Sequence, residues 1–205
     1  MKSAQIGVQL YTVREETARD MAATLRRVAE IGYGAAEFAG WGSVLPREIR
    51  EVLDAEGIRA IGAHVPFVDL ETRPLQVLAE CAIVGCEWVV VPSVPEGWRS
   101  SPQQVGRLAG RLNSLGELCR AEGLRLAYHN HAVEFAPLES PGVDSDATAQ
   151  TAWETLVAET SRELVDLELD VYWAAFAGRA PHEVLGATGG RVRLLHMKDM
   201  AADEA

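Results

Sequence analysis

Imidazole and carboxylate side chains gather in one short stretch of the sequence. An apolar run at Leu124–Ala127 is followed within a few residues by His129, Asn130, His131 and Glu134. The run predicts a buried strand, so these groups are expected at its carboxyl end. Burying them without partners costs free energy, so they form either a structural polar network or an acid–base or divalent-metal site. Imidazole and carboxylate together suit Zn, Mn, Co or Fe, and both interpretations stay open from this stretch alone.

The ends of other predicted strands carry further ionisable residues, and four of the five histidines of the chain occupy such positions. The carboxyl ends of parallel strands meet at one edge of a sheet, so we expect these side chains to share one face. His182, at a predicted helix start, is expected on the surface. The residues at or just beyond the other strand ends are Glu37, His64, Asp170, His196 and Lys198.

Such a set of groups can perform proton-transfer chemistry next to a carbonyl. A divalent cation held there would bind the vicinal oxygens of a hydroxy-ketone and acidify the neighbouring C–H bond. Glu134 or His131 can then take the proton and leave a metal-stabilised enediolate, to whose oxygen Lys198 offers a positive charge or a proton. Trp173 lies beside a strand end, where its ring is either a stacking surface for a sugar or an ordinary packed aromatic.

The elements that must position these residues alternate regularly along the chain. Predicted helices are followed by glycine shortly before the next strand, which indicates right-handed βα units and a parallel sheet. The turn after the first strand, Tyr11-Thr-Val-Arg-Glu-Glu, contains no glycine, which favours a (β/α)₈ barrel over a dinucleotide-binding fold. Residues 137–149 are predicted to form a loop. Strands are predicted at 6–11, 35–39, 58–63, 87–92, 124–129, 164–169 and 191–195, with helices at 17–31, 46–56, 75–84, 102–122, 151–160 and from 181.

Composition predicts one globular α/β domain, residues 1–205, and argues against several classes of partner. The chain has 19 Lys and Arg against 30 Asp and Glu, so its net charge of −11 would repel a nucleic acid backbone. No apolar run approaches the roughly 20 residues that span a membrane, and the amino terminus lacks the pattern of a signal peptide. Cys81, Cys86 and Cys119 are expected as reduced core residues of a cytoplasmic protein.

Five segments of the chain form a recognisable pattern: Gly32–Gly40, Ala63–Phe67, Ala127–Phe135, Leu169–Ala174 and His196–Asp199. Together they resemble the sugar phosphate isomerase/epimerase family, the xylose isomerase-like TIM barrels. The resemblance runs through essentially the whole chain. It implies a barrel enzyme, an isomerase or epimerase, that acts on a small sugar or keto-polyol with Mn, Co, Mg or Zn. The inosose dehydratases and enzymes of 3-keto sugars in this family imply, as an alternative, a lyase with the same enediolate chemistry.

The resemblance also implies roles for individual residues. The family's metal is held by groups after strands five, six, seven and eight, which here assigns Asp170 and His196, together with either Glu134 or His129 after strand five. The His-x-Lys-Asp ending resembles the dehydratase branch, where the lysine lies near the substrate. Substrate contacts are expected from Glu37, His64, Asn130 and Trp173.

One departure from the family affects these expectations. The sequence stops at Ala205, shortly after the seventh predicted strand, so the eighth βα unit and its Glu ligand are not in it. We therefore expect an incomplete barrel with about seven parallel strands. The chain would be part of a longer protein, or a partner chain, as in a homo-oligomer, would supply the missing wall. A non-catalytic sugar-binding remnant is the further alternative.

Overall fold

The structure is a computed structural model that describes residues 6–138 and 150–200. The chain divides into two compact units, the first comprising Met1–Val90 with Ala121–Leu124 and the second Val91–Arg120 with Arg125–Ala205. Most of the loop predicted at 137–149 lies outside the described residues. The expectation of a single domain over residues 1–205 stays a prediction.

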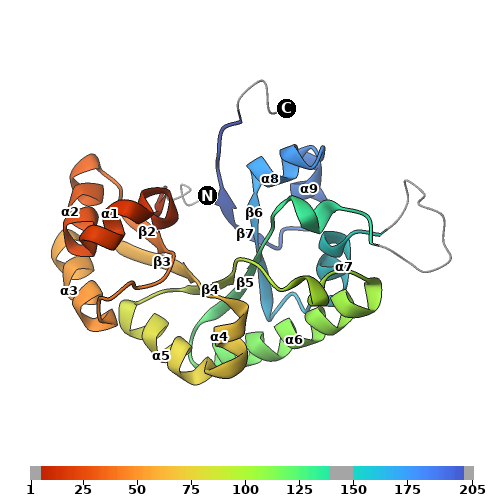
Figure 1. Cartoon of the computed structure of the whole chain (residues 1–205), viewed down its shortest axis with the longest axis horizontal. Coiled ribbons are helices and arrows are strands. Elements are labelled where there is room, and N and C mark those ends of the chain that lie inside the picture. The colour runs from red at the N-terminus through yellow and green to blue at the C-terminus, as the bar shows by residue number, and fades with distance from the viewer. Residues whose placement is uncertain (1–5, 139–149, 201–205) are drawn as a thin grey trace. The chain divides into compact units, whose positions relative to one another are not determined.

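The first unit is built on strands β1 to β4, which pair in chain order and in parallel. Helix α2 packs on α3, and α3 packs on α5, alongside these strands (Figure 1). The strands are β1 (Val8–Gln9), β2 (Ala35–Phe38), β3 (Arg59–His64) and β4 (Trp88–Val91), and the helices are η1 (Leu10–Val13), α1 (Arg14–Arg19), α2 (Met21–Ile31), α3 (Pro46–Glu56), α4 (Phe67–Thr72) and α5 (Pro74–Val84).

Local sequence explains where these helices begin and end. Helices α2, α3 and α5 stop at Gly32, Gly57 and Gly85, whose φ angles of 106°, 67° and 84° suit a residue without a side chain. The single helix predicted over 17–31 is instead divided at Asp20. Its side chain accepts a hydrogen bond from the backbone N–H of Ala23 at 2.8 Å and so begins α2.

The second unit contains strands β5 to β7, again parallel and in chain order (Figure 1). With the four strands of the first unit, seven strands occur in the described part of the chain, which confirms the predicted α/β alternation. Nowhere in residues 6–138 and 150–200 is there a helix of the length and apolarity that a membrane span requires. The elements are η2 (Glu96–Trp98), α6 (Pro102–Ala121), β5 (Arg125–His129), η3 (Ala132–Phe135), α7 (Ala152–Glu159), β6 (Val165–Asp170), α8 (Val171–Phe176), α9 (Pro181–Ala187) and β7 (Val192–His196).

Strand β6 has an apolar face and an acidic face, although all six of its residues are buried. Leu167 and Leu169 belong to a hydrophobic cluster with aromatic residues such as Trp153. Because side chains alternate along a strand, the three acids of β6 share the opposite face. The first of them, Asp166, is neutralised by Arg125, whose Nε and Nη2 donate to its two oxygens at 2.7 and 2.9 Å. The other two, Glu168 and Asp170, need different partners.

Helix α6 approaches the segment before β6 very closely. At Gly116, a Cβ atom would lie 3.0 Å from the carbonyl carbon of Leu164 and closer still to its oxygen. Glycine therefore allows a contact that no other residue could make without movement of the backbone.

Candidate functional site

The carboxyl ends of β5, β6 and β7 bring two imidazoles and a carboxylate together. His129 Nδ1 lies 2.9 Å from Glu168 Oε2, and His196 Nε2 lies 3.4 Å from the same oxygen. Ligand atoms of these three residues lie within 4.8 Å of one another. Register explains the arrangement, because His129 is aligned with Glu168 on adjacent strands and Asp170 with His196.

Asp170 adds a second carboxylate to the group. Its Oδ2 lies 3.8 Å from His129 Nε2, 3.6 Å from His196 Nδ1 and 2.5 Å from Lys198 Nζ. Burial by itself would raise the pKa of Asp170, but hydrogen bonds from His196 and Lys198 and from the backbone N–H of Trp173 outweigh it and lower the pKa to about 2. Asp170 is therefore ionised at neutral pH.

The charges and donor types of this group fit a divalent metal ion. Glu168 and Asp170 are 1% and 0% exposed, and Lys198 is the cationic side chain in contact with Asp170. Two carboxylates so deeply buried require compensating positive charge. Imidazole nitrogen with carboxylate oxygen is a ligand set for Zn, Mn, Co or Fe, so His129, Glu168 and His196 fit such an ion by chemistry as well as by proximity.

An aromatic surface adjoins these groups. The ring of His131 lies 5.0 Å from that of His129 and 5.5 Å from that of Trp173. Lys198 Nζ lies 5.9 Å above the Trp173 ring. A half-buried indole beside a cation and an imidazole offers a flat apolar face to a small polar ring.

A model of the family described as "Xylose isomerase-like TIM barrel" matches residues 25–205. The chain belongs to this family. The family assignment agrees with the parallel βα architecture and confirms the fold class expected from the sequence.

Two solved structures of the xylose isomerase-like fold show the similarity in space. A sugar phosphate isomerase/epimerase from Parabacteroides distasonis superposes with a TM-score of 0.85 at 25% identity, covering 96% of this chain and 79% of that one. The IolI protein, solved with a bound zinc atom, superposes with a TM-score of 0.73 at 16% identity, covering 96% of this chain and 73% of that one, which shows a shared fold.

The curated relatives are inosose dehydratases, and the match to them is partial. The inosose dehydratase of Clostridium beijerinckii is 29% identical over 96 residues, which are 47% of this chain and 28% of the relative. The aligned part thus spans less than a third of that relative's length.

Glu168 is the member of the site that the sequence interpretation missed. It stands inside the strand predicted at 164–169, whereas the other members of the group stand at strand ends. The alternation Val-Asp-Leu-Glu-Leu-Asp over residues 165–170 carries the signal, since it places three acids on one face of a strand.

Glu134 was predicted as a metal ligand and as a catalytic base, and the structure places it apart from the group of ligand atoms. Its Oε1 accepts a hydrogen bond from the Tyr128 hydroxyl at 3.1 Å, and its Oε2 accepts one from the backbone N–H of His131 at 2.7 Å. Burial raises the pKa of Glu134, against the effect of these two hydrogen bonds. These contacts suit a residue that holds the loop of His131 in place. In the group of ligand atoms, the carboxylate comes from Glu168 and not from Glu134.

Asn130 was predicted to contact substrate, but it is fully buried. Its Oδ1 accepts a hydrogen bond from the Asp170 backbone N–H at 2.8 Å, and its Nδ2 donates to the Asp170 carbonyl oxygen at 3.3 Å. Both ends of the amide therefore bind the main chain of Asp170. This placement corresponds to a positioning residue instead of a substrate contact.

The Asn130→Ala variant tests this positioning. It leaves the buried backbone N–H of Asp170 without its acceptor, so we expect a loss of about 1–3 kcal/mol in the free energy of unfolding. We also expect metal affinity to fall about tenfold, because Asp170 is less well held. Urea denaturation and metal titration measure the two effects. Asn113→Ala, which removes the hydrogen bond to the Ser161 backbone N–H on another part of the unit, is the control for metal affinity. Wild-type metal affinity in Asn130→Ala would contradict the positioning role.

Glu37 and His64, both predicted substrate contacts, lie together in the first unit. Glu37 Oε2 is 3.6 Å from His64 Nε2 and accepts a hydrogen bond from Gln9 Nε2 at 2.8 Å. Gln9 was not singled out from the sequence. It is aligned with Glu37 between β1 and β2, so the three side chains come from neighbouring strands.

Proposed function

We propose that this protein is a divalent-metal-dependent isomerase or epimerase of a small sugar or keto-polyol, working through an enediolate. The observation that carries the proposal is the convergence of His129, Glu168 and His196 from three adjacent strands, with ligand atoms within 4.8 Å of one another. Membership of the xylose isomerase-like family and sugar-processing relatives support it.

The proposed chemistry divides between the ion and the chain. His129, Glu168 and His196 would hold a divalent ion, Mn, Co, Mg or Zn, which would supply Lewis acidity next to the substrate's carbonyl group. His131 would remove the acidified proton, because its ring lies beside the ligand group and is half-buried, with access to solvent. Lys198, held by Asp170, would give a proton to the developing alkoxide oxygen. Trp173 would pack against the ring or chain of the substrate.

A dehydratase is the second candidate. The curated relatives are inosose dehydratases, and an enediolate that expels a neighbouring hydroxyl group loses water instead of returning a proton. Lys198 would then protonate the leaving oxygen.

Hydrogen exchange from solvent separates these candidates. The protein is incubated with Mn or Co in D₂O and a panel of ketohexoses and inososes, and products are followed by NMR and mass spectrometry. An isomerase or epimerase incorporates deuterium at carbon, whereas a dehydratase yields a product lighter by one water. Lys198→Gln is expected to slow either reaction about a hundredfold. Ligand binding without exchange or dehydration would contradict both enzyme proposals.

A further inference from the structure

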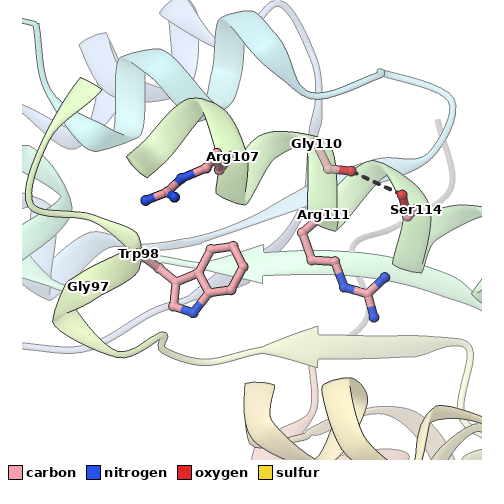
Figure 2. Close-up of a pocket in the computed structure, with 6 residues that line it drawn as sticks. All are labelled: Gly97, Trp98, Arg107, Gly110, Arg111 and Ser114. Atoms are coloured by element: carbon pink, nitrogen blue, oxygen red, sulfur yellow. Dashed lines mark hydrogen bonds between the residues drawn. The ribbon is translucent and has the colours of Figure 1, made fainter. Parts of the chain in front are cut away.

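A separate cavity of about 440 Å³ lies in the second unit, between η2 and α6 (Figure 2). Its size is in the range of small-molecule pockets. Figure 2 shows the indole of Trp98 facing the part of α6 that carries two arginines, with their guanidinium groups directed to either side of the ring. The lining residues are Gly97, Trp98, Arg107, Gly110, Arg111 and Ser114.

The spacing of the α6 residues creates this cavity. Arg107, Gly110, Arg111 and Ser114 stand at positions i, i+3, i+4 and i+7, so they share one face of the helix. A Cβ atom at Gly110 would meet nothing within 4 Å, and the same holds at Gly97. The space next to both glycines is therefore open.

The charge of the cavity is unusual for this chain. The sequence has a net charge of −11, yet the lining residues include two arginines and no acid. Among the residues that the structure describes, Arg107 has neither an ion pair nor a hydrogen bond from its side chain. An anion beside Arg107 would therefore give this guanidinium group a partner of opposite charge.

We propose that this cavity binds a phosphate ester carried on a ring with an apolar face. Guanidinium groups bind phosphate through paired, charge-assisted hydrogen bonds. Arg107 provides such a group, and binding a phosphate there breaks no interaction of its side chain within the described chain. The indole of Trp98 stacks on the ring, whether that ring is a nucleobase or a sugar. The backbone fixes Trp98, because its N–H donates to the Pro95 carbonyl oxygen at 2.9 Å. This site uses none of the residues of the candidate metal centre.

Calorimetry on the whole 205-residue chain, with EDTA and at low ionic strength, tests the proposal. The ligands are AMP, glucose 6-phosphate, inorganic phosphate, adenosine and glucose. We expect at least one ester to bind about tenfold more tightly than inorganic phosphate and than its unphosphorylated parent. Tighter binding of AMP would identify a nucleotide as the ligand, and tighter binding of glucose 6-phosphate a sugar phosphate.

Variants locate the binding. Arg107→Gln is expected to lower the affinity about tenfold, and Trp98→Leu to reduce it to that of inorganic phosphate. Arg120→Gln, an exposed arginine on the same helix outside the cavity, is the matched control and should bind as the wild type. Asp170→Asn should also leave ester binding unchanged, which separates this result from the proposed function. Binding of neither ester, binding that survives Arg107→Gln and Trp98→Leu, or binding lost in Asp170→Asn would overturn the proposal.

Discussion

Replacing Glu168 by glutamine is expected to lower the affinity for a divalent metal at least about a hundredfold and turnover about a thousandfold. The Glu168 carboxylate lies between His129 and His196, with one oxygen 2.9 and 3.4 Å from their nitrogens. Glutamine has a similar shape, but it lacks the negative charge that would hold the proposed ion. Metal content by plasma mass spectrometry and a metal titration of activity measure the two effects.

The control for this prediction is Glu163→Gln. Glu163 is exposed just before the same strand, and its carboxylate accepts a hydrogen bond from the Ser161 hydroxyl at 2.8 Å, so the same chemical change there should leave metal content intact. His196→Ala should lose the metal as Glu168→Gln does. Metal retained in Glu168→Gln but lost in His196→Ala would make Glu168 a hydrogen-bond partner of the ligands instead of a ligand.

The Gly116→Ala variant is expected to lose about 3 kcal/mol in its free energy of unfolding. The new methyl group would meet the carbonyl group of Leu164, whose carbon atom would lie 3.0 Å from it. Neither group can rotate away, because the methyl carbon is attached directly to the backbone of α6 and the carbonyl group is part of the backbone before β6. Helix α6 would have to move away from the segment that leads into β6. Urea denaturation of the wild type and the variant gives the difference.

Gly110→Ala is the matched control on the same helix. Its methyl group would enter open space, so the higher helix propensity of alanine should stabilise the protein by about 0.5–1 kcal/mol. The two substitutions are chemically identical and differ only in what surrounds the glycine. Equal effects of both would show that the close approach at Gly116 does not contribute to stability.

Much of the secondary structure could be predicted because it depends on local signals. Gly32, Gly57 and Gly85 end helices where the sequence places them, and the apolar run before Pro92 forms β4 as expected. Short elements could not be predicted. Helices α4 and α8 have six residues each, too few turns to show a helical period.

The candidate site was predicted in part, for a comparable reason. His129, Asp170 and His196 stand at strand ends, where βα folds carry their functional groups, and they do come together. Glu168 lies within β6, and Gln9, the last residue of β1, lies inside the longer strand predicted at 6–11, so position along the predicted strands gives no indication of either. To assign these two residues to the candidate sites, one must know which residues on neighbouring strands are aligned. This alignment is a property of the whole sheet and cannot be derived from a single segment.

The alternation of strand β6 also affects how reliably the chain reaches its folded state. A shift of one residue against β5 or β7 would turn Asp166, Glu168 and Asp170 toward the cluster around Trp153, where each carboxylate would be buried without a partner. Such misaligned pairing is therefore strongly disfavoured. The acids of β6, two of which suit a metal ion, thus also fix the register of the strand. Replacing them with apolar residues would remove these charged groups and would also permit misaligned, aggregation-prone strand pairing.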